Sequence, residues 1–290
     1  MRPSSFALLL PGLLLVGLFA HAGRAESVLQ SKRLTVRGLH GAEPAVAIWT
    51  RPPAETDKLP IVIAFHGKSE SLLGPQRGHA AWVERYGLGK AYEALLGGVL
   101  TPLAFGGLVR ERELAGLNAE LAARPFAGLV TVGVYTPDLL RARPEEVERY
   151  ARWVALELLP QLRAQLPVAS AVPRQAGVDG VSLGGMIALE VGLRFPEVFG
   201  AVGTMQPAIR GREAELATLA ERARAVHAQR LRLLSSDGDP FLPAARALSQ
   251  ELRKRRIAHE LVVYPGRHDY AFNRGPGSIE LLHFHDHALR

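Results

Sequence analysis

Two continuous apolar runs constrain the fold of this chain most strongly. Residues 60–65 read Pro-Ile-Val-Ile-Ala-Phe, and residues 129–135 read Leu-Val-Thr-Val-Gly-Val-Tyr. Short runs rich in β-branched residues are typical of strands that are buried on both faces of a parallel sheet. A sheet of this kind needs helices on both of its faces.

The rest of the chain alternates strand and helix patterns. Further strands are expected at residues 33–36, 45–49, 199–203, 231–234 and 260–264, with another leading through Val178 to Ser182. A turn over Gly41 and Glu43–Pro44 is expected to separate the first two. Helical spacing of apolar residues covers 144–162, 183–193, 213–228, 242–252 and 279–289. The pattern predicts an α/β fold with a mainly parallel central sheet and helices on both faces.

Residues 87–126 are the least readable part of the chain. The segment is apolar and Gly-rich, and it is too long for an ordinary loop. We expect one or two helices, at residues 90–96 and 108–121. The segment serves either to cover the sheet or to form an acyl-pocket wall or lid.

The N-terminus has the layout of a secretory signal peptide. One Arg precedes an apolar stretch from Phe6 to Ala20, and small residues then offer cleavage after Ala22 or Ala25. The stretch is shorter than the ~20 residues of a membrane-spanning helix, although an uncleaved anchor is the alternative. We therefore expect residues 1–25 to be a signal peptide and residues 26–290 to be one exported (periplasmic or secreted) catalytic domain, with no stable membrane span after cleavage.

Composition excludes several classes of protein. The chain has 48% hydrophobic and 22% charged residues, which is the balance of a globular protein rather than a disordered one. It has no Cys, so thiol nucleophiles, disulfides and Cys-based metal sites are excluded. The net charge of +7 comes from basic residues spread along the chain. The run at 253–256 is interpreted as the solvated end of a helix, and no nucleic-acid partner is expected. A patch for anionic polymers or lipids is the alternative.

One motif carries chemistry. Gly180, Val181, Ser182, Leu183 and Gly184 fit the pattern G-x-S-x-G, with an apolar strand before it and a helical pattern after it. A nucleophile on a sharp strand-to-helix turn crowds the residues two positions either side, so both glycines must lack side chains. The turn also places the Ser182 hydroxyl at a helix N-terminus, where developing negative charge is favoured.

A serine nucleophile needs a base, and the base needs a carboxylate to orient it. For a serine on this kind of turn, the chain order is Ser, then acid, then His. His268 follows the last expected strand and is the candidate base. Asp239 and Asp237 both follow the strand before it and are candidate acids, while Asp269 is a weaker one because sequence neighbours rarely point at each other. The alternative for the Asp-rich stretch is a plain turn and helix cap.

Two backbone N–H groups are expected to form an oxyanion hole. One belongs to Leu183, directly after the nucleophile. The other belongs to the loop after residues 60–65, where Gly67 permits a close approach and Lys68 or Ser69 supplies the donor. The alternative for His66 and Gly67 is simply a turn at a strand end.

Three histidines lie close together near the C-terminus. His283 and His287 would share one face of a helix, and two such residues can bind a metal. No Glu follows the first of them in an H-E-x-x-H pattern, and His285 would point elsewhere. We expect these histidines at the surface or the core edge, and no metal site.

These features resemble the α/β-hydrolase superfamily, and more narrowly the esterase group related to esterase D, enterochelin esterase and feruloyl esterases. The similarity spans roughly residues 61–289. It is carried by the His66–Gly67 turn, residues 157–160, the G-x-S-x-G turn, residues 239–242 and residues 265–268. In that family the acid directly precedes an x-Phe-Leu step, so the resemblance favours Asp239 over Asp237. Residues 87–126 match no pattern of the family, so its substrate pocket is not carried over.

The expected function is that of an exported serine esterase. The resemblance implies hydrolysis of a carboxylic ester through an acyl-serine intermediate, without a cofactor. It also suggests a small-molecule or polymer-linked substrate, with a carbohydrate- or phenolic-linked ester as the first guess. The alternatives are an acyltransferase or peptidase on the same triad, a non-catalytic binding protein of the same fold, and a basic polymer binder. The sequence leaves the oligomeric state open.

Overall fold

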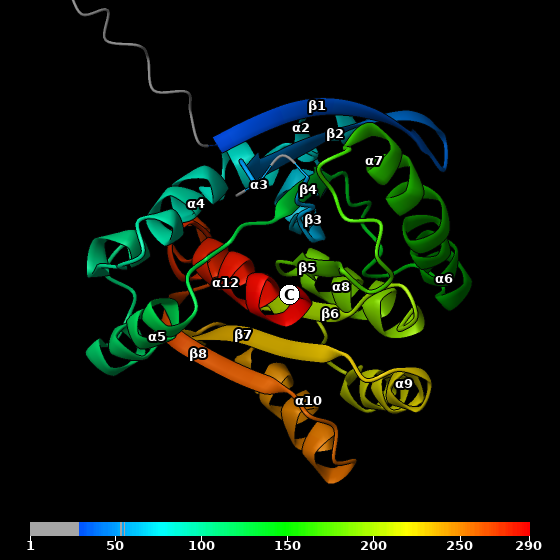
Figure 1. Ribbon diagram of the computed structural model, residues 1–290. Coiled ribbons are helices and arrows are strands. Elements are labelled where there is room, and N and C mark those ends of the chain that lie inside the picture. The colour runs from blue at the N-terminus through cyan, green and yellow to red at the C-terminus, as the bar shows by residue number, and fades with distance from the viewer. Residues whose placement is uncertain (1–28, 53, 55) are drawn as a thin grey trace, which may run out of the picture.

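An eight-stranded sheet runs through the molecule (Figure 1). The computed structural model describes residues 29–290 apart from residues 53 and 55, so the expected signal peptide lies outside the described residues. The spatial order is β1-β2-β4-β3-β5-β6-β7-β8. The strands are β1 (Leu29–Gly38), β2 (Gly41–Thr50), β3 (Ile61–Phe65), β4 (Val130–Val134), β5 (Ala176–Gly180), β6 (Ala201–Met205), β7 (Arg230–Gly238) and β8 (Glu260–Arg267).

The central part of the sheet is parallel, as the sequence predicted. β3 pairs with β4 on one side and β5 on the other, and β5 to β8 continue in parallel. β1 is antiparallel to β2, and β2 is antiparallel to β4. The carboxyl ends of β3 and of β5 to β8 therefore meet at one edge, and the predicted site residues follow β3, β5, β7 and β8.

The first hairpin differs from the prediction. Its turn is at residues 39–40, whereas Gly41 and Glu43–Pro44 belong to β2. The turn predicted from the proline is therefore wrong. A proline cannot donate to a neighbouring strand, but pairing of β2 with β4 begins only at Ala45. Pro44 thus has a strand on one side only, a position that tolerates it.

Helices cover both faces of the sheet (Figure 1). Buried side chains of β3 alternate between two apolar clusters, with Ile61, Ile63 and Phe65 in one and Val62 and Ala64 in the other. The first cluster is completed by α6 (Pro144–Trp153), α7 (Leu159–Gln165), α8 (Leu183–Arg194), α9 (Glu213–Val226) and α10 (Leu242–Lys254). The second is completed by α3 (Ala81–Glu84), α4 (Leu88–Leu96), α5 (Glu111–Ala123) and α12 (Ser278–Leu289).

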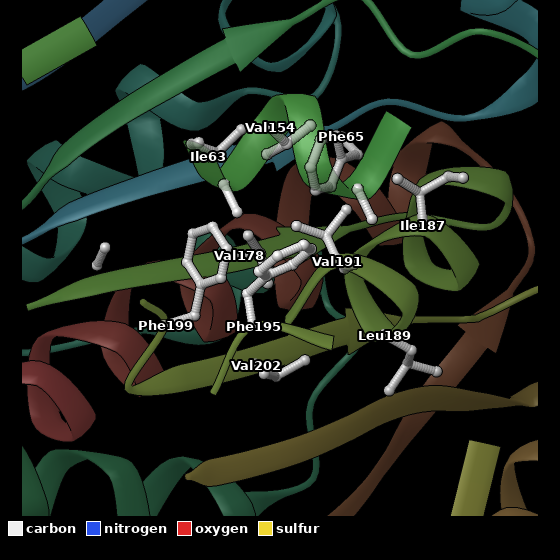
Figure 2. Close-up of a cluster of buried hydrophobic side chains, with 14 of the residues drawn as sticks. Ile63, Phe65, Val154, Val178, Ile187, Leu189, Val191, Phe195, Phe199 and Val202 are labelled. Atoms are coloured by element: carbon white, nitrogen blue, oxygen red, sulfur yellow. The ribbon is translucent and has the colours of Figure 1, made fainter. Parts of the chain in front are cut away.

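The first cluster anchors the helix that follows the sequence motif. Figure 2 shows Ile187 and Val191 of α8 facing Phe65 of β3 and Val178 of β5. All of these side chains are at most 1% exposed. Because protein interiors are close-packed, this contact fixes the position of α8 relative to the strand that leads into it.

The predicted long helix from residue 144 is interrupted. A π-helical turn, η2 (Val154–Leu158), joins α6 to α7, and Leu159 donates its N–H to the Val154 carbonyl. Pro160 has no N–H to give to the Leu156 carbonyl, so the regular helical ladder cannot pass this point. Within residues 29–290, apart from 53 and 55, no helix has both the length and the apolar character needed to cross a membrane.

Residues 87–126 form α4, the short 3-10 helix η1 (Pro102–Phe105) and α5. The first predicted helix, 90–96, corresponds to α4, and the second, 108–121, to α5, which begins three residues later. Tyr92, Phe105 and Leu121 are buried in the cluster shared with α12. Through these side chains the segment covers one face of the sheet.

Candidate active site

Ser182 lies at the turn between β5 and α8. Its backbone has φ 57° and ψ −112°, a conformation that non-glycine residues rarely adopt. The Ser182 N–H donates to the Met205 carbonyl at 2.9 Å, and its own carbonyl accepts from the N–H of Ala208 at 3.0 Å. Bonds on both sides of the residue hold it in this strained geometry.

The two motif glycines leave no space for a side chain. A Cβ on Gly180 would lie 2.3 Å from the Gly184 carbonyl oxygen. A Cβ on Gly184 would lie 2.3 Å from the carbonyl oxygen of Phe65 and 2.6 Å from that of His66. Both contacts are with backbone, which cannot swing away. The turn is thus packed directly against the end of β3.

His268 and Asp239 come together at the ends of β8 and β7. His268 Nδ1 lies 3.0 Å from Asp239 Oδ1. The Asp239 side chain is fully buried, and it also accepts from Ser235 Oγ at 2.6 Å and from the N–H of Phe241 at 3.0 Å. These donors stabilise the charged carboxylate and fix its direction. The imidazole edge packs on the Phe241 ring, with centroids 5.3 Å apart.

The two other candidate acids are engaged elsewhere. Asp237 accepts from the N–H of Gly266 and from the Arg110 guanidinium, each at 3.1 Å. Asp269 caps the short helix α11 (Tyr270–Phe272) by accepting from the Phe272 N–H at 3.0 Å. The geometry therefore pairs His268 with Asp239.

Ser182 and His268 open onto one cavity of about 120 Å³. Because Nδ1 faces Asp239, the second ring nitrogen, Nε2, is the one left for a proton from the serine. The cavity is lined by Gly67, Lys68, Ser69, Glu70, Tyr86, Val181, Ser182, His268, Asp269, Tyr270 and Asn273. No residue of segment 87–126 is among them.

The two expected oxyanion donors each begin a helix. Leu183 is the first residue of α8, and Lys68 is the first residue of α1 (Lys68–Ser71). The first N–H groups of a helix have no partner within it, so both remain available to an anion. The Lys68 ammonium is 3.1 Å from Asp138. Gly67 has an ordinary φ of −77°, and a Cβ there would meet Tyr86 Oη at 3.4 Å, so neither conformation nor clash requires glycine.

The sequence analysis missed a carboxylate and two tyrosines beside the loop between β3 and α1. Glu70 is buried, and it accepts from the hydroxyl of Tyr86 and from that of Tyr270. Tyr86 Oη in turn accepts from the Gly67 N–H at 3.1 Å. Burial, together with the neighbouring Glu70, raises the pKa of Tyr86 far above its usual range and keeps it a donor. The three residues stand far apart in the chain, so no local pattern could reveal them.

His66 also holds this loop in place through hydrogen bonds. Its Nε2 accepts from the Thr136 N–H at 2.9 Å, so Nδ1 carries the proton and donates to the Gly67 carbonyl at 2.9 Å. Burial lowers the pKa of His66 to about 4, which keeps the ring neutral. His66 is therefore more than a residue at a strand end, because it fixes the carbonyl that directly precedes the Lys68 N–H.

Comparison with known proteins identifies a related family and similar structures. Residues 138–274 match the family described as "Putative esterase". The match includes Ser182, Asp239 and His268. The matched residues make up a little less than half of the chain, and the chain as a whole has the α/β-hydrolase fold. A search of the curated proteins found no match.

Solved structures of hydrolases have a similar fold. A ferulic acid esterase matches with a TM-score of 0.64 and 16% identity, over 90% of this chain and 97% of that one. An S-formylglutathione hydrolase from Staphylococcus aureus matches with a TM-score of 0.58 and 12% identity, over 89% and 96%. A feruloyl esterase module from Clostridium thermocellum, complexed with sinapinate, matches with a TM-score of 0.60 and 11% identity, over 91% and 90%. At these identities the similarity shows the fold, and the family match supports serine-dependent ester hydrolysis.

Proposed function

We propose that this hydrolase cleaves carboxylic esters through an acyl intermediate on Ser182. One observation carries the proposal. Ser182 and His268 face the same cavity, and the far side of the imidazole is held by the buried carboxylate of Asp239. A nucleophile, a base and an orienting acid on three different loops have no evident purpose in a protein that only binds.

The residues divide the reaction between them. His268 Nε2 takes the Ser182 Oγ proton as the oxygen attacks the ester carbonyl, and returns it to the leaving alcohol. Water then attacks the acyl-serine, with the same nitrogen first accepting and then returning a proton to Ser182. Asp239 holds the tautomer and stabilises the imidazolium. The N–H groups of Leu183 and Lys68 stabilise the oxyanion, a contribution of roughly 2.7–4 kcal/mol per donor in comparable sites.

The residues that line the cavity indicate the class of substrate. The cavity volume of about 120 Å³ is small, and the lining includes Lys68, Glu70 and two tyrosines. Polar and aromatic groups suit a carbohydrate- or phenolic-linked ester better than a long fatty chain. The structural similarity to a ferulic acid esterase supports the same class. We expect methyl ferulate or an acetylated sugar to be hydrolysed faster than p-nitrophenyl octanoate.

Hydrolysis of p-nitrophenyl acetate and butyrate tests the proposal. Wild type is compared with Ser182→Ala and with Ser31→Ala, which removes an exposed serine of β1. Turnover is expected in wild type and in Ser31→Ala and not in Ser182→Ala. Equal turnover by all three proteins would refute the assignment of Ser182.

Export is part of the same proposal. Residues 1–25 are proposed as a signal peptide that is removed to leave residues 26–290 as a single catalytic domain. The support is the sequence pattern of the N-terminus. Expression of the full chain in a bacterium, followed by mass analysis of the periplasmic fraction, is expected to show a product beginning at residue 23 or 26. A full-length chain confined to the membrane fraction would indicate an uncleaved anchor instead.

A further inference from the structure

The three histidines of α12 separate into two environments. His285 is fully buried, with Nε2 3.0 Å from Asp179 Oδ2 in the core. His283 and His287 lie on another face of the helix, with ring centroids 4.3 Å apart. His285 is thus occupied by a structural contact, whereas the other two face a common space.

A carboxylate from a different helix completes this group. Glu120, near the end of α5, places Oε2 3.6 Å from His283 Nε2. One donor atom from each of Glu120, His283 and His287 lies within 4.8 Å of the others. The sequence predicted no metal site because no acid follows His283 at the expected spacing. The acid comes from a segment that only the fold brings alongside α12.

His283 is the unusual member of the group. It is 6% exposed, and its Nε2 has no hydrogen-bond partner among the described residues. Buried polar atoms are nearly always satisfied, so a water molecule or an ion is expected at this nitrogen. The nitrogen faces Glu120 and His287 across a cavity of about 460 Å³ that all three residues line.

The surroundings of the cavity are mixed in charge. Glu260 and Glu280 also line it, as do Arg124 and Arg230. Arg230 is paired with Glu260 at 3.0 Å, and Arg124 donates to the His287 carbonyl at 3.1 Å. Arg232 lies 3.6 Å from Glu280, and Arg290 is also close to His287, so the carboxylates of the cavity are largely balanced by guanidinium groups.

We propose that Glu120, His283 and His287 bind one divalent transition-metal ion, with Zn²⁺ as the ion that the donor set fits best. Two imidazole nitrogens and one carboxylate oxygen are common Zn²⁺ ligands, at about 2.0–2.2 Å, and water completes the tetrahedron. Donor atoms on such an ion lie roughly 3.4 Å apart. The three donors, which lie within 4.8 Å of one another, must therefore move closer by up to about 1.4 Å, and the Glu120 side chain is exposed and free to move. Zn²⁺ binds imidazole in its neutral form, so binding is expected to weaken at acidic pH.

The place of this site in the fold indicates its role. Arg230 and Glu260, which share the cavity, begin β7 and β8, whereas Asp239 and His268 follow the other ends of these strands. The ion would therefore lie at the edge of the sheet opposite the catalytic groups. There it would cross-link α5 to α12 and hold segment 87–126 against the C-terminal helix, which favours a role in stability rather than in the reaction.

Calorimetric titration of the EDTA-treated, desalted protein with ZnCl₂ tests this inference. We expect one Zn²⁺ per chain and a higher thermal unfolding midpoint with Zn²⁺, but no such response to Mg²⁺. Glu120→Gln and His287→Ala are expected to weaken Zn²⁺ binding at least tenfold and to remove the shift in midpoint. Both side chains lie at or near the surface, so the variants should fold.

Two matched controls accompany these variants. Glu111→Gln changes another exposed carboxylate of α5, and His227→Ala removes an exposed histidine. Both are expected to bind Zn²⁺ as wild type does, and p-nitrophenyl ester hydrolysis is expected to be unchanged in all four. Absence of one-to-one binding in wild type, or its persistence in both Glu120→Gln and His287→Ala, would overturn the inference.

Discussion

Ser182 has a backbone conformation that costs free energy, of order 1–3 kcal/mol for a residue of this kind. The contacts that stabilise this conformation follow from the motif, because its two glycines allow the turn to pack on the end of β3. His268 could be predicted by its position after the last strand. Glu70, Tyr86 and Tyr270 could not, because their contact depends on the packing of three separate loops.

Replacing Asp237 and Asp239 one at a time distinguishes the two candidate acids. Asp239→Asn removes the negative charge beside His268 Nδ1 and permits the wrong tautomer, so kcat is expected to fall by about 10⁴-fold. Asp237→Asn alters only the contacts to Gly266 and Arg110, and kcat should stay within about threefold of wild type. Steady-state hydrolysis of p-nitrophenyl acetate provides the measurement. A larger loss in Asp237→Asn would reverse the assignment.

Adding one methyl group tests the packing of the turn. Gly184→Ala places a Cβ 2.3 Å from the Phe65 carbonyl oxygen, and we expect the free energy of unfolding to fall by about 3 kcal/mol or more. Gly116→Ala is the matched control, because a Cβ there meets nothing within 4 Å in the middle of α5. That variant should gain up to ~1 kcal/mol from helix propensity. Urea denaturation measures both, and equal effects would show that the close contact is not real.

At the scale of elements, the strands were predicted better than their connections. The short, β-branched runs of β3 and β4 were recognised as strands, since runs of this length and composition are typical of strands buried on both faces. The hairpin turn was displaced because Pro44 is tolerated where β2 has one neighbour. The π-helical turn η2 was not predicted. Apolar residues keep their helical spacing through this region, so the spacing does not reveal that Pro160 lacks an N–H.

The loop between β3 and α1 depends on an element far along the chain. Tyr86→Phe removes the acceptor of the Gly67 N–H and a donor to Glu70, so the Lys68 N–H loses its fixed position. We expect kcat to fall by about tenfold with little change in KM, in line with the loss of one hydrogen bond. Tyr92→Phe is the control, because that buried hydroxyl bonds to Thr131 away from the cavity. Equal kcat values for the two variants would argue against this positioning role.

At the scale of the whole molecule, the contacts between buried charged groups could not be predicted from the sequence. Arg232 is fully buried and contacts Asp179 at 2.8 Å, and His285 also contacts Asp179. These residues come from β7, β5 and α12, and nothing in their local sequence marks them as partners. The layered fold followed from apolar patterning, whereas this network depends on how the layers meet.

Buried neutral histidines make stability depend on pH. Burial lowers the pKa of His66 to about 4 and that of His283 to about 3, whereas an unfolded histidine titrates near 6.5. The unfolded chain thus binds protons first, and stability is lost as pH falls from about 6.5 towards 4, on the order of 3 kcal/mol for His66 alone. Asp286, whose pKa burial raises to about 6, opposes this with a smaller shift.

Urea denaturation at several pH values, with EDTA present, measures this dependence. We expect the free energy of unfolding to decrease steadily between pH 7 and pH 5. A constant or rising value over that range would contradict the assignment of neutral buried histidines.

The central claim is that Ser182 is an activated nucleophile, and labelling by a fluorophosphonate tests it most directly. Intact mass after brief incubation is expected to show one adduct on wild type, peptide mapping should place it on Ser182, and Ser182→Ala should remain unmodified. Labelling should also slow markedly in His268→Ala, since the base is needed to activate the hydroxyl. A wild-type protein that stays unlabelled, or one labelled equally in Ser182→Ala, would contradict the account.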